Sequence, residues 1–212
     1  MKSYVVEFYS RIFQVLSWAS PFNIIRKLIP SLKNHDAFID SWVLIHLVLA
    51  AVILFFSSAS AITVCELVFI IYGGIRIFEI VIYQINVLIF DQYRKEIEGK
   101  QYSVRSYRRS LILAVHNYFE VLIWFAIFYR NFFDSFISKF DLNTINISLY
   151  YSLVTMSTLG YGDIAPRTTE ARMMVFTHTV IAIFLTLMIL ARFISLLPKP
   201  KTRSEHEKNN DN

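Results

Sequence analysis

Four long apolar segments constrain this chain more than any other feature of its sequence. They cover residues 41–56 (or 41–61), 63–90, 111–128 and 171–197. A helix needs about 20 mostly apolar residues to cross the hydrocarbon core of a bilayer, so we predict four transmembrane helices. Apolar residues make up 55% of the 212 residues and charged residues only 17%, which is too hydrophobic for an ordinary soluble domain. The predicted fold class is an all-α membrane protein.

Composition also argues against several other classes of protein. Because 16% of the residues are aromatic, most of the chain is not expected to be disordered. The net charge of +5 does not indicate nucleic-acid binding, since Lys and Arg cluster beside the apolar segments, as is usual in membrane proteins. The single cysteine, Cys65, excludes an intrachain disulfide and a cysteine-rich metal site.

The distribution of Lys and Arg predicts the orientation of the chain. Five lie in residues 1–41, six in 91–110 and five from Arg192 onward, whereas the opposite side holds three. Positive residues concentrate on the cytoplasmic side of membrane proteins. We therefore predict a multi-pass protein of the cell membrane with both termini in the cytoplasm and residues 131–170 facing outward.

These patterns divide the chain into five predicted segments. Residues 1–40 form a cytoplasmic or interfacial segment, 41–90 a hairpin of two transmembrane helices, and 91–110 a basic cytoplasmic linker. Residues 111–197 form a module of two spans with a short helix between them, and 198–212 a disordered cytoplasmic tail. Near the N-terminus, apolar residues recur at helical spacing. This suits a helix in the membrane interface or one packed beneath the bundle, and the prolines at 21 and 30 should interrupt the segment.

The segment 147–157 is apolar but too short to cross a bilayer. We predict a re-entrant helix of about three turns, capped by Asn146. It would enter from the outside, so its C-terminal end would point toward the membrane centre. That end carries a partial negative charge, which favours a cation there.

Directly after this helix, glycines stand at alternate positions, 160 and 162. If successive residues alternate between right-handed and left-handed dihedrals, their carbonyl groups all point to one side. Glycine adopts the left-handed state readily, and other L-residues resist it. Such a strand would present a column of carbonyl oxygens. Backbone of this kind is tolerated at membrane depth only where it lines a cavity or is buried in protein.

The stretch 155–163 resembles the pore signature of the potassium channel family, with 158–162 in the place of the selectivity filter. The order of helix, re-entrant helix, filter and helix over 111–197 fits a pore module of that family. The resemblance implies that backbone carbonyls replace the hydration shell of K⁺ at Thr158, Leu159, Gly160 and Tyr161. It also implies that the Thr158 hydroxyl adds the innermost site and that Gly162 forms the outer mouth.

The resemblance also implies residues that support the filter. Asp163 would lie behind it, hydrogen-bonded to Tyr150 or Tyr151, with Thr155 as a further supporting residue. The family often has tryptophans at the two tyrosine positions, and Leu159 replaces the commoner Val or Ile. The Leu159 side chain is expected to point away from the pore, so selectivity should survive.

One filter strand cannot surround an ion, and closed symmetric homo-oligomers are the usual solution. The resemblance implies a homotetramer in a lipid bilayer that conducts K⁺ passively. No enzyme activity, organic cofactor, organic substrate or nucleic-acid partner is expected, and K⁺ is the permeant ion. The alternatives are a weakly selective monovalent cation channel and a K⁺-transport subunit that depends on a partner protein.

One stripe of the last predicted span is the candidate lining of a cavity below the filter. Its members recur at three- and four-residue spacing, and the alternative for each is packing in the core: Thr179, Ala182, Ile183, Thr186 and Leu190. The span contains no glycine, and Ala182 lies about where many members of the family have a hinge glycine. A sharp glycine-hinged opening is therefore not expected.

Ionisable residues inside the predicted spans are costly and rarely face lipid. They are Glu66, Arg76, Glu79, His116, Glu120 and His178. We favour a buried structural pair of Arg76 with Glu79 or Glu120 over a gating network. No spacing requires a metal site from His116, Glu120 and His178. A conventional voltage sensor is not expected, because Arg76 has no companions at three-residue spacing.

Overall fold

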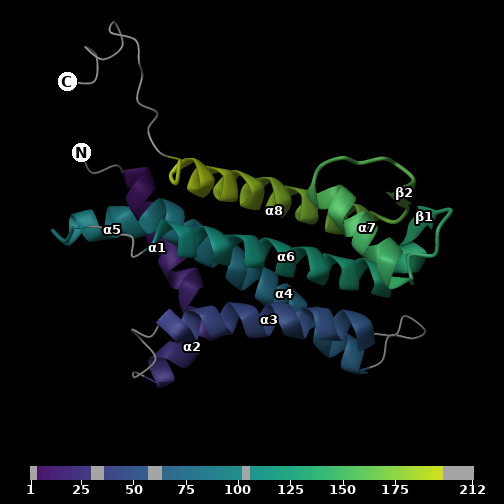
Figure 1. The fold of residues 1–212 in the computed structure, drawn as a ribbon, viewed down its shortest axis with the longest axis horizontal. Helices are drawn as coiled ribbons and strands as arrows, with labels where there is room; N and C mark the ends of the chain where they lie inside the picture. Colours follow the sequence, from purple (N-terminus) through teal and green to yellow (C-terminus); the bar gives the residue numbers. More distant parts are fainter. Residues whose placement is uncertain (1–3, 30–35, 57–63, 102–105, 198–212) are drawn as a thin grey trace, which may run out of the picture.

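The computed structural model describes residues 4–29, 36–56, 64–101 and 106–197. The tail 198–212 and the turn of the predicted hairpin lie outside the described residues. Helices dominate the fold (Figure 1), in the order α1 (Tyr4–Trp18), α2 (Pro21–Leu28), α3 (Asp36–Phe56), α4 (Val64–Ile85), the π-helix η2 (Asn86–Phe90), α5 (Asp91–Ile97), α6 (Tyr107–Asn131), η3 (Phe133–Ser135), β1 (Phe136–Ser138), α7 (Ile145–Met156), β2 (Ile164–Pro166) and α8 (Thr169–Ile194).

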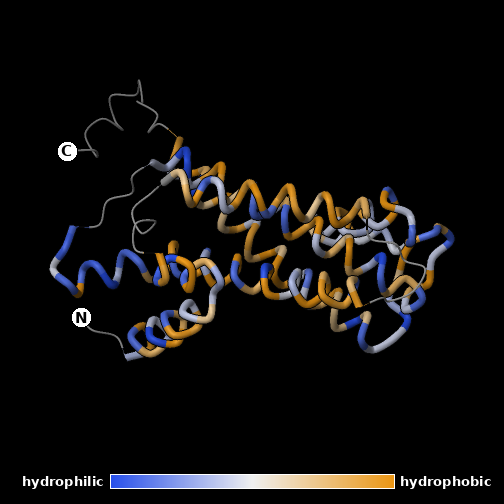
Figure 2. Tube along the Cα trace, turned by 90° about the horizontal axis from the view of Figure 1, so that it is seen from below, coloured by the Kyte–Doolittle hydropathy of each residue, from blue (hydrophilic) through white to orange (hydrophobic). Residues whose placement is uncertain are grey.

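Helix α6 is the centre of the molecule, because α3, α4, α7 and α8 all pack against it. The long helices α3, α6 and α8 run along the long axis (Figure 1), with α2 and α5 toward one end and α7, β1 and β2 at the other. Apolar residues dominate the long helices, whereas polar residues concentrate toward the two ends (Figure 2). The first residues of α6 and the last residues of α8 lie at the same end of the fold as α5 (Figure 1).

Three helices are long and apolar enough to cross a membrane: Ala37–Phe56, Tyr107–Asn131 and Thr169–Ile194. The chain is thus an all-α membrane protein, as predicted. The span predicted over 63–90 is divided in the structure between α4 and η2. Helix α4 has 22 residues, but it carries three buried ionisable side chains, Glu66, Arg76 and Glu79. It is not among the three candidate spans, so a fourth transmembrane helix remains a prediction.

The N-terminal segment is helical, as its periodicity predicts. Helix α1 contacts α4 and η2, while Tyr4, Val5 and Phe8 remain exposed. Pro21 does more than interrupt the segment. It occupies the first turn of α2, where its missing N–H costs no hydrogen bond and its fixed φ suits a helix.

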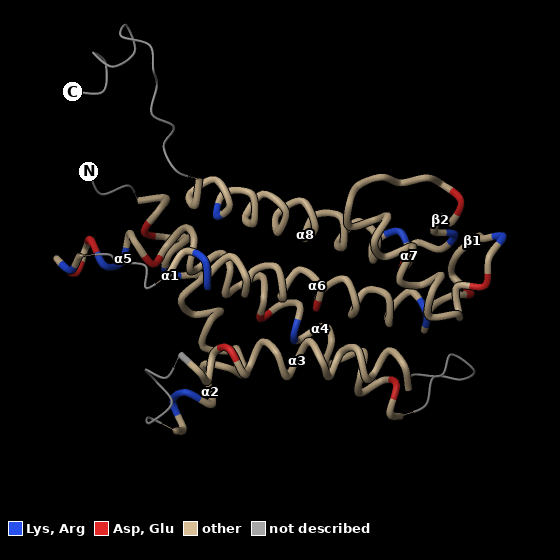
Figure 3. Tube along the Cα trace, viewed as in Figure 1, with Lys and Arg blue, Asp and Glu red and all other residues tan. Residues whose placement is uncertain are grey.

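Charged residues are concentrated outside the middle of the long helices (Figure 3). Those of α2 and α5 and the Arg192 at the end of α8 lie toward one end of the fold. Near that end Arg109 of α6 forms an ion pair with Asp40 of α3, at 2.7 Å between Nη2 and Oδ1. The assignment of this end to the cytoplasm stays a prediction.

Candidate functional site

The short helix α7 occupies the position predicted for a re-entrant helix, with bounds shifted by one or two residues. Its N-cap is Thr144, not Asn146 as the sequence suggested. The Thr144 hydroxyl donates to the carbonyl of Asp141 at 2.8 Å. Helix α7 is fastened to α6, since the buried Ser152 hydroxyl donates to the Leu122 carbonyl at 2.7 Å.

The segment after α7 alternates in backbone conformation. Positive φ angles occur at every second residue: 60° at Thr158, 55° at Gly160 and 76° at Gly162. The two glycines adopt the left-handed state that their spacing predicts. Thr158 was not foreseen, although extending the glycine alternation back by two residues would have identified it. Among the described residues other than glycine, Thr158 alone has a positive φ, a conformation that costs an L-residue roughly 1–2 kcal/mol.

The first part of this segment is held against the end of α7. The Leu159 amide donates to the Val154 carbonyl at 3.0 Å, and the Thr158 amide donates to the Thr155 carbonyl at 3.1 Å. Large side chains nevertheless project outward, since Leu159 is 58% exposed and Tyr161 is 66% exposed in the single chain. The segment is therefore hydrogen-bonded to α7 at its start, and its large side chains are exposed in the single chain.

Asp163 ends the segment and is hydrogen-bonded back to α7. The Tyr150 hydroxyl donates to Asp163 Oδ2 at 2.7 Å, and the Ile164 amide donates to Asp163 Oδ1 at 3.1 Å. Of the two tyrosines considered as partners, the structure selects Tyr150. Tyr151 is instead buried, and its ring centroid lies 4.6 Å from that of Tyr129 on α6.

A two-stranded sheet leads the chain from Asp163 into α8. Strands β1 and β2 pair antiparallel, with Ile137 opposite Ala165. The amide of Arg167 donates to the Ser135 carbonyl at 2.9 Å. The Thr168 hydroxyl caps α8 by accepting from the Ala171 amide at 3.2 Å. The exit from the segment is thus hydrogen-bonded to η3 and β1, which follow α6 in the chain.

Helix α8 buries one face inside the chain and leaves the other exposed. The buried side chains are Ala171, His178, Ala182, Leu185, Met188 and Arg192. Ala182 is fully buried, which corrects its assignment to the cavity-lining stripe. Hydropathy could not separate these faces, because α8 is apolar around most of its circumference.

The other four members of the predicted stripe lie outside that buried face. Ile183 is 47% exposed and Leu190 is 50% exposed. Thr186 is exposed and Thr179 half-buried in the single chain. The Thr179 hydroxyl donates to the Val175 carbonyl one turn earlier, at 2.9 Å.

Three of the buried charges of α4 and α6, those of Arg76, Glu79 and Glu120, form one cluster. Arg76 donates from Nε and Nη2 to the two carboxylate oxygens of Glu120, at 2.9 Å each, and from Nη1 to Glu79. The expected pair is confirmed, with both candidate partners engaged at once. The Phe22 amide donates to Glu79 at 2.7 Å. The cluster therefore ties α4 to α6 and to the start of α2.

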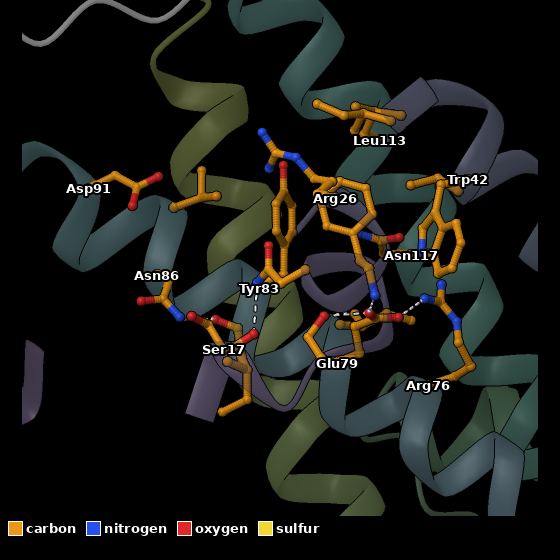
Figure 4. A pocket seen from close by; sticks show the side chains of 18 of the residues that line it. Ser17, Arg26, Trp42, Arg76, Glu79, Tyr83, Asn86, Asp91, Leu113 and Asn117 are labelled. Atoms are coloured by element: carbon orange, nitrogen blue, oxygen red, sulfur yellow. Dashed lines mark hydrogen bonds and ion pairs between the residues drawn. The ribbon is translucent and has the colours of Figure 1, made fainter. Parts of the chain in front are cut away.

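Arg76 and Glu79 also line a cavity of about 240 Å³ between α2, α3, α4 and α6 (Figure 4). Trp42, Tyr83 and Asn117 contribute further walls. Most of the lining residues come from α1 to α5, Asn117 comes from α6, and none comes from 158–162.

The remaining ionisable residues do not form a metal site. The His178 Nδ1 is 2.9 Å from the Tyr129 hydroxyl, and the His178 ring stacks on Phe125 with centroids 3.8 Å apart. His116 Nδ1 instead faces the Ile112 carbonyl of its own helix, at 2.8 Å. In the described part of the chain, no group of three His, Cys, Asp or Glu residues could hold a metal ion.

Residues 118–199 match a family model described as an ion channel. The match begins within α6 and includes α7, the alternating segment and α8. No curated protein and no solved structure matched the chain. The match supports an ion-channel pore module over these residues, in a multi-pass membrane protein.

Proposed function

We propose that four copies of this chain form a K⁺-selective channel whose filter is the segment 158–162. The observation that carries the proposal is the alternation of left-handed φ angles at Thr158, Gly160 and Gly162. With the intervening residues outside the left-handed region, successive carbonyl groups can turn to the same side. Four such strands would supply rings of oxygens that replace the hydration shell of K⁺.

The surroundings of this segment support the same function. Helix α7 ends directly before it, so the partial negative charge of the helix C-terminus favours a cation beside the carbonyls. The hydrogen bond from Tyr150 to Asp163 fixes the segment from behind. A filter must resist collapse around a smaller ion or none, and these contacts oppose that collapse.

Exposure in the single chain supports an assembly of several copies. Leu159 and Tyr161 are more than half exposed, and large side chains at membrane depth need protein around them when the backbone beside them is irregular. Neighbouring copies would supply that cover. On α8, the exposed Ile183, Thr186 and Leu190 would line the pathway below the filter.

Conduction through such a pore needs no covalent chemistry. Ions shed water as they enter, occupy successive carbonyl rings, and move by displacement between adjacent sites. The protein supplies fixed oxygens at the filter and an apolar wall below it. Selectivity then depends on how well the oxygen rings match dehydrated K⁺.

The test is a measurement of reversal potential with purified protein in planar bilayers, with K⁺ on one side and Na⁺ on the other. A reversal potential that follows the K⁺ gradient is expected. A value near zero would favour the weakly selective cation channel. Conduction that appears only with an added partner protein would favour the transport subunit.

The assembly is tested separately. The mass of the detergent-solubilised protein, corrected for bound detergent, should be near four chains of 24.8 kDa. A monomer that conducts K⁺ would contradict the tetrameric pore, because one strand cannot surround an ion.

A further inference from the structure

One arginine joins the end of α8 to two other helices. Arg192 lies in the last turn of α8 and is 8% exposed. Its Nη1 donates to the carbonyl and hydroxyl oxygens of Ser110 on α6, at 2.8 Å each. Its Nη2 donates to Gln84 Oε1 on α4 at 2.7 Å. These acceptors are neutral, and the guanidinium uses its fork geometry to reach both helices at once.

These bonds hold α8 on the side away from the proposed pore. Arg192 continues the buried face of α8, whereas Leu190, two residues earlier, is exposed. Two residues correspond to about 200° around a helix, so the two side chains project in nearly opposite directions. The contacts from Arg192 therefore draw the end of α8 toward α4 and α6 of its own chain.

Gln84 is placed to transmit changes from the N-terminal half of the chain. It is 1% exposed and stands two residues before the π-helix η2. Asn86, the first residue of η2, donates to the Phe13 carbonyl of α1 at 3.1 Å and accepts from Arg94 at 2.6 Å. Single-turn π segments are frequent at functional sites. A short path of hydrogen-bonded groups thus leads from α1 to the segment that carries Gln84.

We propose that Arg192 and Gln84 form a latch that couples α4 to the end of α8 and favours the open pore. The inference rests on the proposed channel function. Closing a pore of four chains requires the ends of α8 to approach one another, which draws Arg192 away from Gln84. Because the latch exists in only one of the two arrangements, it shifts the equilibrium toward that arrangement.

The experiment measures open probability in single-channel recordings of the purified protein. Gln84→Leu keeps the approximate size of the side chain and removes the acceptor, so the open-to-closed ratio should fall about tenfold for each of the four copies, the order expected for a hydrogen bond to a charged group. Gln84→Glu supplies a charged acceptor and should raise the ratio. Unitary conductance and K⁺ selectivity should not change, because the filter is distant in the fold.

Gln92→Leu is the matched control. Gln92 lies on α5, is exposed, and donates to Glu96 Oε1 at 2.8 Å. The Gln92→Leu variant should leave the open-to-closed ratio unchanged. Equal effects of the leucine and glutamate variants at position 84, or no effect of either, would overturn the latch. If Gln84→Leu does not assemble, Ser110→Ala removes one acceptor of Arg192 and should lower the open-to-closed ratio by about threefold for each of the four copies.

Hydrogen exchange separates failure of the latch from failure of the channel proposal. In detergent, Gln84→Leu should accelerate amide exchange in residues 190–194, and Gln92→Leu should not. Unchanged exchange would show that the contact does not hold the end of α8, and would overturn the latch whatever the current shows. Absence of K⁺ current in the unmodified protein would instead refute the proposed function.

Discussion

Gly160→Ala tests the proposed filter through backbone conformation alone. Gly160 has a φ of 55°, and a Cβ built on it meets nothing within 4 Å in its own chain. The added methyl group therefore causes no clash within the chain. Its effect comes from the resistance of an L-residue to left-handed dihedrals.

The expected magnitude follows from that resistance and from the number of copies. The left-handed state costs an L-residue roughly 1–2 kcal/mol, so four copies in one pore cost roughly 4–8 kcal/mol. Each 1.4 kcal/mol corresponds to a factor of ten, so the population of pores with all four strands in place falls by about 10³ to 10⁶. We expect K⁺ current to be abolished.

The assay is K⁺ flux into proteoliposomes, normalised to the amount of assembled protein. Two controls carry the same substitution. Gly74→Ala lies within α4, where the new Cβ also meets nothing within 4 Å, and should leave the flux unchanged. Gly99→Ala replaces a residue with a φ of 68° outside the pore module, so it should lower stability without changing flux per assembled channel. Normal flux in assembled Gly160→Ala protein would refute the filter assignment.

Three further substitutions test other contacts. Gly73→Ala places a Cβ 2.5 Å from Trp124 Cε3 and should lower stability by about 1–3 kcal/mol; an unchanged melting temperature in detergent would show that the indole can move aside. Arg76→Gln leaves two buried carboxylates without their cation, so a loss of about 3–5 kcal/mol is expected; a stable variant with a flatter conductance–voltage curve would reveal a voltage sensor instead. Tyr150→Phe removes the hydrogen-bond donor to Asp163 and should make K⁺ current decline faster during sustained recording; an unchanged time course would contradict this support.

The sequence predicted the parts of the fold that depend on length and local conformation. Apolar segments of spanning length became α3, α6 and α8. The short apolar segment between the last two spans became α7, and the glycines at 160 and 162 adopted left-handed dihedrals. Each of these features depends on local composition and backbone preference. It depends little on which other parts of the fold the segment contacts.

Features that depend on which faces meet could not be predicted in the same way. Ala182 shares its helical stripe with exposed residues, yet it is fully buried. The contact between Arg192 and Gln84 joins residues that are 108 apart in the sequence, and a single sequence contains no signal for that pairing. The hydrogen bond between Tyr129 and His178 was missed for the same reason.

For the buried charge of Arg76 the sequence left two possible partners, and the structure contains both contacts. The spacing of Arg76 and Glu79 indicated a pair within one helix, and Glu120 was the alternative partner on another. Folding makes both contacts, because the guanidinium presents donors in more than one direction. Two carboxylates that the sequence offers as alternative partners can therefore both bind the same guanidinium in the folded chain.

The contacts of Arg76 also bear on what opens the proposed pore. Two carboxylates surround one guanidinium, so the cluster carries no surplus of positive charge to move outward with voltage. Displacing Arg76 would separate it from buried partners at 2.9 Å, in surroundings where opposite charges attract more strongly than in water. We therefore expect opening to depend weakly on membrane potential. If the proposed latch holds, helix α4 acts on the proposed pore through Gln84 at its end. We therefore expect the gating stimulus to act where α1 contacts α4 and exposes apolar side chains.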